Sequence, residues 1–265
     1  MGIEFTVLVT SVAALAVAYV WRKFANRYRR WGPSRTGQVK QTPWSGRAGG
    51  GTGDDDLLLW GTTYHRTVWT PPQRQLALVV LGDKPRRSKA LRFMAVGLAL
   101  LNARVLLLDG WRERGGRGSR RKARLGSIAG LSKVVASAAS CLRNEGGDSL
   151  SVGVVGLWGA GSAALLAAAN GAIDGPVFAL GSPRVPRPPT AVLGREDIYL
   201  VHAANDHRVP VNEFETNARN WGVPRQRRLL LLRGGRRFVA QETVVVAQLA
   251  LWLARWTSVL PTPAE

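Results

Sequence analysis

The chain has 265 residues, of which 46% are hydrophobic, so it can build one large α/β domain or two small ones. Its formal net charge of +20 at pH 7 fits either an anionic partner or a solvated basic surface, and charge alone does not decide between them. The single cysteine excludes an intrachain disulfide, and three scattered histidines without a Cys/His cluster argue against a metal site.

The N-terminal segment, residues 1–25, is predicted to be a transmembrane anchor. Phe5–Trp21 is an uncharged apolar run near the lower length limit for a spanning helix. Basic residues follow this run and only Glu4 precedes it, so the positive-inside rule puts the rest of the chain on the cytosolic or matrix side. The alternative, a cleaved signal peptide, lacks its basic n-region. We expect a single-span protein of the mitochondrial inner membrane with its domain facing the matrix, or else of a cytosol-facing membrane.

Residues 26–56 are basic and then Gly-rich, a composition that predicts a linker. The folded domain is expected over residues 57–265. It opens with strand-like runs at Leu57–Trp60 and Thr62–Trp69, which predict a hairpin or paired edge strands.

Apolar strands and amphipathic helices then alternate along the chain, a pattern that predicts an α/β fold with a mostly parallel sheet covered on both faces. The predicted strands are 75–81, 104–108, 149–157, 176–180, 197–202 and 227–232. The predicted helices are 87–102, 125–143, 160–172, 212–221 and 240–256.

The most informative feature is the bend at residues 156–161, called the elbow below. A buried apolar strand enters a Gly-rich turn and leaves as an Ala/Leu helix, the layout of a nucleophile elbow with the pattern G-x-S-x-G. Trp158 stands at the serine position. An indole N–H is only a hydrogen-bond donor, so this side chain cannot attack a carbonyl.

Five segments, in the same chain order, resemble the α/β-hydrolases from about Leu57 to the C-terminus. They are LVVLGDKP, RVLLLDGWRERGGRG, VGVVGLWGAGSAALLAAA, DIYLVHAANDHRVPV and LLLLRGGRRFV. The sequence between Leu180 and Asp197 leaves room for no sizeable cap domain, so the chain is most similar to the lidless members.

The resemblance implies where a catalytic triad would lie. Its nucleophile falls on Trp158, its acid on Asp206, and its histidine on Arg236 or Arg237. The family order is Ser, Asp, His, and no histidine follows His207, so that order cannot be completed.

The loop that usually reads His-Gly-Gly carries Gly82 and Asp83, and a carboxylate there would repel a developing oxyanion. We therefore expect a pseudoenzyme with no catalytic residues, its degenerate triad being Trp158, Asp206 and Arg237.

Three neighbouring polar residues have structural interpretations. Ser162 is expected inside the helix, pointing away from the elbow tip as a small packing residue. His202 is expected to be a hydrogen-bonded core histidine, and Asp206 to cap backbone N–H groups or pair with an arginine. The run Gly159–Ala164 also fits the dinucleotide fingerprint G-x-G-x-x-A, which leaves a nucleotide-binding alternative open.

Arg-rich loops follow several strand ends, which share one edge in a parallel sheet. Their arginines would bind carboxylate or phosphate groups. The anion-binding candidates are Arg112, Arg114, Arg117, Arg184, Arg187, Arg236 and Arg237.

The function expected from the sequence is that of a catalytically inactive, membrane-anchored accessory subunit of a membrane protein complex. Its expected partners are other subunits, with anionic lipid head groups as a second class. No recognised module supports a nucleic-acid partner, and no cofactor is expected. The alternatives are a serine hydrolase or acyltransferase with unconventional residues, or an anion- or nucleotide-binding module built on the Gly159–Ser162 turn and the arginines.

Overall fold

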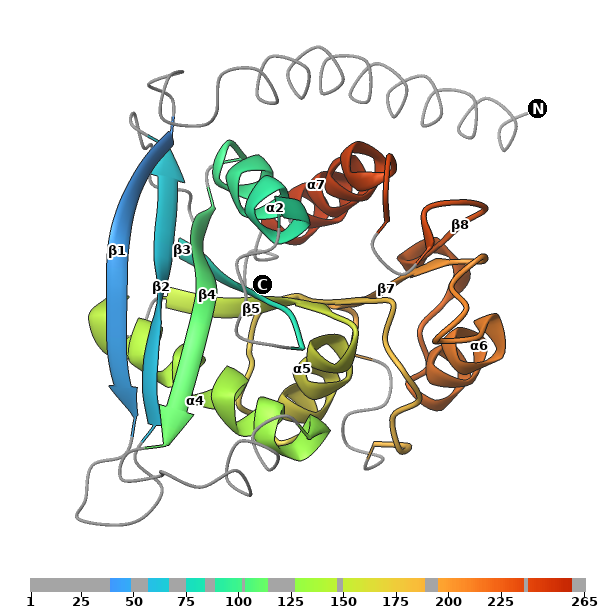
Figure 1. Cartoon of the computed structure of the whole chain (residues 1–265), viewed down its shortest axis with the longest axis horizontal. Helices are drawn as coiled ribbons and strands as arrows, with labels where there is room; N and C mark the ends of the chain where they lie inside the picture. The colour runs from blue at the N-terminus through green and yellow to red at the C-terminus, as the bar shows by residue number, and fades with distance from the viewer. Residues whose placement is uncertain are drawn as a thin grey trace, which may run out of the picture.

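The protein is seen here as a computed structural model, which describes residues 39–48, 57–66, 75–83, 89–101, 103–113, 127–146, 150–188, 195–235 and 238–258. These residues build one sheet between two layers of helices (Figure 1). The described strands are β1 Val39–Ala48, β2 Leu57–Arg66, β3 Gln75–Leu81, β4 Arg104–Glu113, β5 Leu150–Leu157, β6 Val177–Leu180, β7 Ile198–Ala203 and β8 Arg228–Leu231. The described helices are α2 Lys89–Ala99, α4 Ile128–Gly146, α5 Gly159–Ala169, α6 Val211–Asn220, the short 3₁₀ turn η3 Arg225–Arg227 and α7 Glu242–Ser258.

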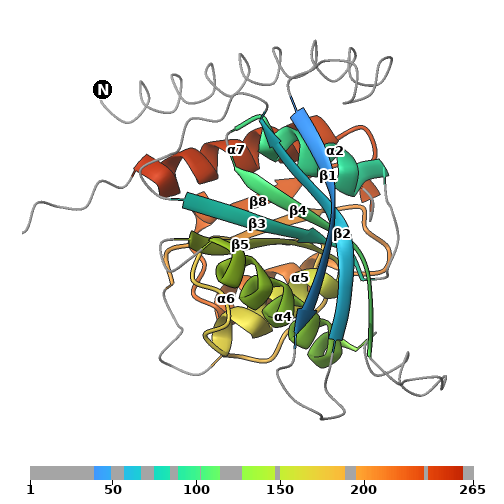
Figure 2. The same cartoon turned by 90° about the vertical axis from the view of Figure 1, so that its left-hand side faces the viewer.

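The sheet is mixed but mostly parallel, as predicted. Its described strands lie in the order β1-β2-β4-β3-β5-β6-β7-β8. The pairs β1–β2 and β2–β4 are antiparallel, and every other described pair is parallel. The parallel strands read as near-continuous Val/Leu/Ala runs because both of their faces are covered. Figure 2 shows the resulting twist, with β1 and β2 running steeply across the end of the sheet.

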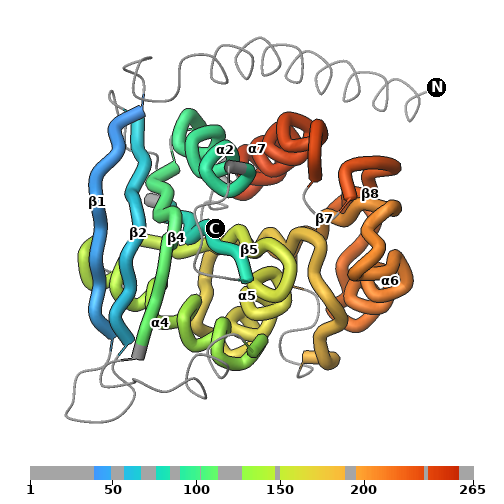
Figure 3. Tube along the Cα trace, in the orientation of Figure 1, coloured from blue at the N-terminus to red at the C-terminus, as the bar shows by residue number. Residues whose placement is uncertain are grey.

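Helices cover both faces of the sheet. On one face α2 and α7 lie side by side (Figure 3). Their buried residues, such as Met94 and Leu249, belong to one apolar cluster with residues of β3, β5 and β7. On the other face lie α4, α5 and α6, which contribute Val135, Leu165 and Phe214 to a second apolar cluster. The predicted two-sided α/β architecture is therefore confirmed.

The first two strands differ from the prediction. Val39–Ala48, expected in the linker, is strand β1, because it pairs along its whole length with β2. Thr62–Trp69 and Leu57–Trp60 were expected as separate strands, yet β2 runs through Gly61 and absorbs the irregularity as a bulge against β4. Strand pairing decided both outcomes, with the next strand in the chain for β1 and with the distant β4 at Gly61, and local composition does not report this pairing.

The predicted anchor Phe5–Trp21 lies outside the described residues. Within the described part of the chain, no helix has the length and hydropathy needed to cross a bilayer.

Candidate functional site

The elbow has the backbone geometry that the sequence predicted. Trp158 joins β5 to α5 with φ 58° and ψ −126°, a conformation that costs a non-glycine residue about 1–3 kcal/mol. Its N–H donates to the carbonyl of Leu180 on the neighbouring strand at 2.8 Å. Its own carbonyl accepts from the N–H groups of Gly161 and Ser162 at 2.9 and 3.3 Å and starts the helix. A half-buried indole thus occupies the tip of a strained strand-to-helix turn.

Two glycines let the helix approach the sheet this closely. A Cβ atom on Gly156 would collide with the carbonyl of Ala160 and lie 2.7 Å from the Cα of Gly161. A Cβ atom on Gly161 would collide with the hydroxyl of Ser182 and lie 2.9 Å from the carbonyl oxygen of Gly156. The Gly-rich pattern in the sequence therefore reflects backbone packing.

The loops that follow β3, β5 and β6 meet at the carboxyl ends of these strands. A Cβ atom on Gly82 would lie 3.6 Å from Cζ3 of Trp158, and one on Gly159 would lie 3.5 Å from the Cβ of Asp83. The Gly82–Asp83 loop, identified by resemblance, is therefore beside the elbow. Gly181, with φ +59°, lies beside another edge of the Trp158 indole. A Cβ atom on Gly181 would lie 3.4 Å from Cδ1 of that ring.

Asp206 reaches the same place from the loop after β7. It is buried, and a Cβ atom on Gly181 would lie 3.9 Å from its Oδ2. Its Oδ1 accepts hydrogen bonds from the N–H groups of Arg208 and Val209, at 2.8 and 3.3 Å. The carboxylate therefore caps its own loop, which is the structural role expected for it.

Phe238, which the sequence analysis missed, completes this site. It is fully buried with φ 53°, and a Cβ atom on Gly181 would lie 3.7 Å from its Cζ. Arg236 and Arg237, the expected histidine positions, lie outside the described residues. No local pattern marks Phe238, because its burial depends on how the β8–α7 loop folds back over β6.

The serine hydroxyls near the elbow face into the packing. Ser162 is fully buried and donates to the carbonyl of Pro183 at 2.8 Å, pointing away from the elbow tip as expected. Ser182 Oγ is buried between α5 and β6 with no hydrogen-bond partner among the described residues. The amides of Gly161 and Ser162 already bond to Trp158, which leaves them unavailable to a pyrophosphate at the Gly159–Ser162 turn.

His202 lies on β7 with its ring fully buried against Phe214, the centroids 5.5 Å apart. It is a core histidine as expected, but neither ring nitrogen makes a hydrogen bond of good geometry within the described chain. Burial lowers the pKa of His202, and the nearby charge of Asp206 and the backbone of Val209 offset this only in part.

We expect acid to destabilise the fold through His202. Because its pKa is below 6.5 when folded, the unfolded chain binds the proton first, and the free energy of unfolding falls as the pH drops below about 6.5. Urea unfolding between pH 8 and pH 5 measures this dependence, and His202→Gln should make it shallower. His65→Gln serves as a comparison and not as a neutral control, because burial and the charges of Lys40 and Arg104 also lower the pKa of His65 and give it an effect of the same sign. If the free energy of unfolding depended on pH in His202→Gln as it does in the wild type, His202 would not be the cause of the acid destabilisation.

Of the anion-binding candidates, Arg112, Arg184 and Arg187 lie among the described residues. Arg184 and Arg187 are exposed in the loop after β6, and the backbone N–H of Arg184 donates to Glu213. Arg112 instead lines a pocket on β1, β2 and β4. Arg114 and Arg117 lie outside the described residues. Among the described residues, no group of His, Cys, Asp and Glu could hold a metal ion.

Comparison with solved structures identifies the fold. A dienelactone hydrolase from Anabaena variabilis shares 18% identity at a TM-score of 0.56, covering 82% of this chain and 98% of its own. An esterase from Pyrococcus furiosus shares 12% identity at a TM-score of 0.61, covering 86% and 97%. A lidless α/β serine hydrolase from Xanthomonas campestris shares 14% at 0.53, covering 83% and 97%. No family model and no curated protein matches the sequence.

The chain therefore has the α/β-hydrolase fold, similar to that of dienelactone hydrolases. At these identities the likeness establishes the fold alone.

Proposed function

We propose that this chain is a non-catalytic α/β-hydrolase-fold protein that serves as a structural or accessory subunit of a membrane complex. The observation that carries the proposal is Trp158, whose indole stands at the tip of the strained elbow where this chemistry needs a hydroxyl. The buried ring of Phe238 occupies the space across Gly181, and the carboxylate of Asp206 accepts a backbone hydrogen bond from its own loop.

Anchoring by residues 1–25 and a location in the mitochondrial inner membrane, with the domain in the matrix, belong to the same proposal. The basic residues that follow the apolar run and the net charge of +20 support this topology. An acidic subunit or anionic lipid head groups would complement that charge, with the arginines of the loops after the strands as contacts.

A second candidate is hydrolysis by unconventional residues. It is favoured by the similar solved structures, which are described as hydrolases or esterases. Ser182, buried beside the elbow with an unbonded hydroxyl, would be the residue to examine, because Ser162 is tied to Pro183.

Labelling of the full chain with a fluorophosphonate probe in mild detergent distinguishes the non-catalytic function from the hydrolase function. We expect no labelling, whereas an active lidless hydrolase labelled in parallel serves as the positive control. Trp158→Ser should also show no ester hydrolysis, since no histidine follows His207 to act as base. Labelling that is lost in Ser182→Ala or Ser162→Ala would overturn the non-catalytic proposal.

The subunit role is tested separately, by purifying the tagged chain from detergent-solubilised membranes. We expect it to purify in a complex of fixed stoichiometry, and purification as a free monomer would contradict the subunit role.

A further inference from the structure

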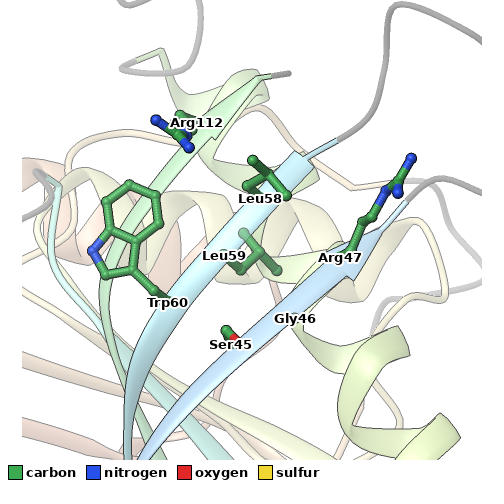
Figure 4. Close-up of a pocket in the computed structure, with 7 residues that line it drawn as sticks. All are labelled: Ser45, Gly46, Arg47, Leu58, Leu59, Trp60 and Arg112. Atoms are coloured by element: carbon green, nitrogen blue, oxygen red, sulfur yellow. The ribbon is translucent and has the colours of Figure 1, made fainter. Parts of the chain in front are cut away.

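A pocket far along the sheet from the elbow opens on β1, β2 and β4. It has a cavity volume of about 490 Å³ and is lined by Ser45, Arg47, Leu58, Trp60 and Arg112 among others (Figure 4). The buried side chains of these strands, such as Leu57 and Trp111, pack into the cluster beneath α4. The pocket is therefore on the opposite face of the strands.

Strand register sets the arrangement of the charged groups. Leu58 on β2 is paired with Arg47 on β1 and with Arg112 on β4, so these three side chains form one cross-strand row. The two arginines stand two strand spacings apart, about 10 Å at the backbone, with Leu58 between them. Trp60 belongs to the next row, where it pairs with Gly110.

The indole of Trp60 lies down on the sheet. A Cβ atom on Gly110 would collide with the ring and lie 2.6 Å from its Nε1, so only glycine at this position lets the ring rest on β4. The side chain is nevertheless 41% exposed. An aromatic ring held against a strand on one side and open on the other is a stacking platform for a planar group.

The pocket is electrostatically suited to an anion. Among the described residues, its lining contains Arg47 and Arg112 and no carboxylate. Asp109, which precedes Gly110, accepts a hydrogen bond from Thr62 at 3.2 Å and does not line the pocket. One guanidinium group can donate two parallel hydrogen bonds to a phosphate group. The cavity volume of the pocket falls within the range of about 300–1,000 Å³ usual for small-molecule sites.

We propose that this pocket binds a nucleoside phosphate. The base stacks on Trp60, and Arg112 holds the phosphate beside it. The site is separate from the elbow and does not depend on whether the elbow is catalytic. A free nucleotide and a nucleotide within a single strand share this chemistry, so the experiment includes both.

Calorimetric titration of the full chain in mild detergent tests the proposal, using AMP, ATP, inorganic pyrophosphate and a short oligo(dT) strand. We expect ATP to bind more tightly than pyrophosphate because only ATP carries a ring to stack. Trp60→Ala should weaken ATP binding about tenfold or more, with Trp60→Phe losing less. Arg112→Gln should weaken binding and reduce its salt dependence. The matched control is Arg219→Gln, an exposed arginine on α6, which should leave binding unchanged.

The outcomes divide clearly. Saturable ATP binding that Trp60→Ala weakens assigns the site to free nucleotides, and binding of the oligonucleotide alone, with the same dependence on Trp60, assigns it to single strands. Equal affinity for pyrophosphate and ATP, equal losses in Arg219→Gln and Arg112→Gln, or no saturable binding at millimolar ligand would overturn the proposal. Melting temperatures of all variants check that the fold is intact.

Discussion

Replacing Phe238 by alanine is expected to lower the free energy of unfolding by about 3–5 kcal/mol, the usual cost of removing a fully buried aromatic ring. Phe238 has no exposed surface and packs with the cluster between the sheet and α7. The ring also lies beside Gly181, next to Trp158. The loss is expected to be large because the backbone there has φ 53°, and alanine would keep this strain without the packing that offsets it.

Urea unfolding followed by circular dichroism measures this loss. The matched control is Val239→Ala, since the next residue is 63% exposed and its truncation should change stability by no more than about 0.5 kcal/mol. Phe238→Leu should fall between wild type and alanine. A loss in Phe238→Ala as small as that in Val239→Ala would mean that the ring does not fill the space beside the elbow.

The second large effect is expected at the elbow itself. Gly156→Ala should destabilise the fold by about 3 kcal/mol, the upper end for overpacking a closely packed site. The new methyl group would meet the carbonyl of Ala160 and, at 2.7 Å, the Cα of Gly161. Both are backbone atoms that cannot rotate away, so α5 has to move off the sheet.

Gly159→Ala, in the same turn, is the control for this substitution. Its methyl group would lie 3.5 Å from the Cβ of Asp83 and 3.7 Å from Leu131, which are ordinary contacts. We expect it to be close to neutral in thermal melting, since alanine is also the better helix former. Equal melting temperatures for the two variants would contradict the close strand–helix packing.

Much of the parallel part of the fold could be predicted because its signals are local. Gln75–Leu81 was predicted with the bounds of β3, because a short apolar run bordered by polar residues and Gly has few other interpretations. The run from β5 into α5 was also predicted within two residues at its inner ends, since the Gly-rich turn separates a Val-rich strand from an Ala-rich helix.

The antiparallel end was harder to predict for a physical reason. β1 contains Pro43 and Gly46, which lower its strand propensity, and it forms because β2 supplies a full set of backbone partners. Choice of partner is a property of the whole chain. The pocket at Trp60 was missed for the same reason, as Arg47 and Arg112 come together only through that pairing.

The order of the parallel strands and helices along the chain, and the position of Trp158 at the elbow, could be predicted from the sequence because hydrophobic periodicity and small-residue spacing are local patterns. The tertiary structure, in contrast, shows that Phe238 lies across Gly181 from Trp158 and that Trp60 rests on Gly110 in a pocket shared with Arg47 and Arg112. Each of these contacts joins segments far apart in the chain, and their closeness follows from strand pairing and loop closure, which no short stretch of sequence encodes.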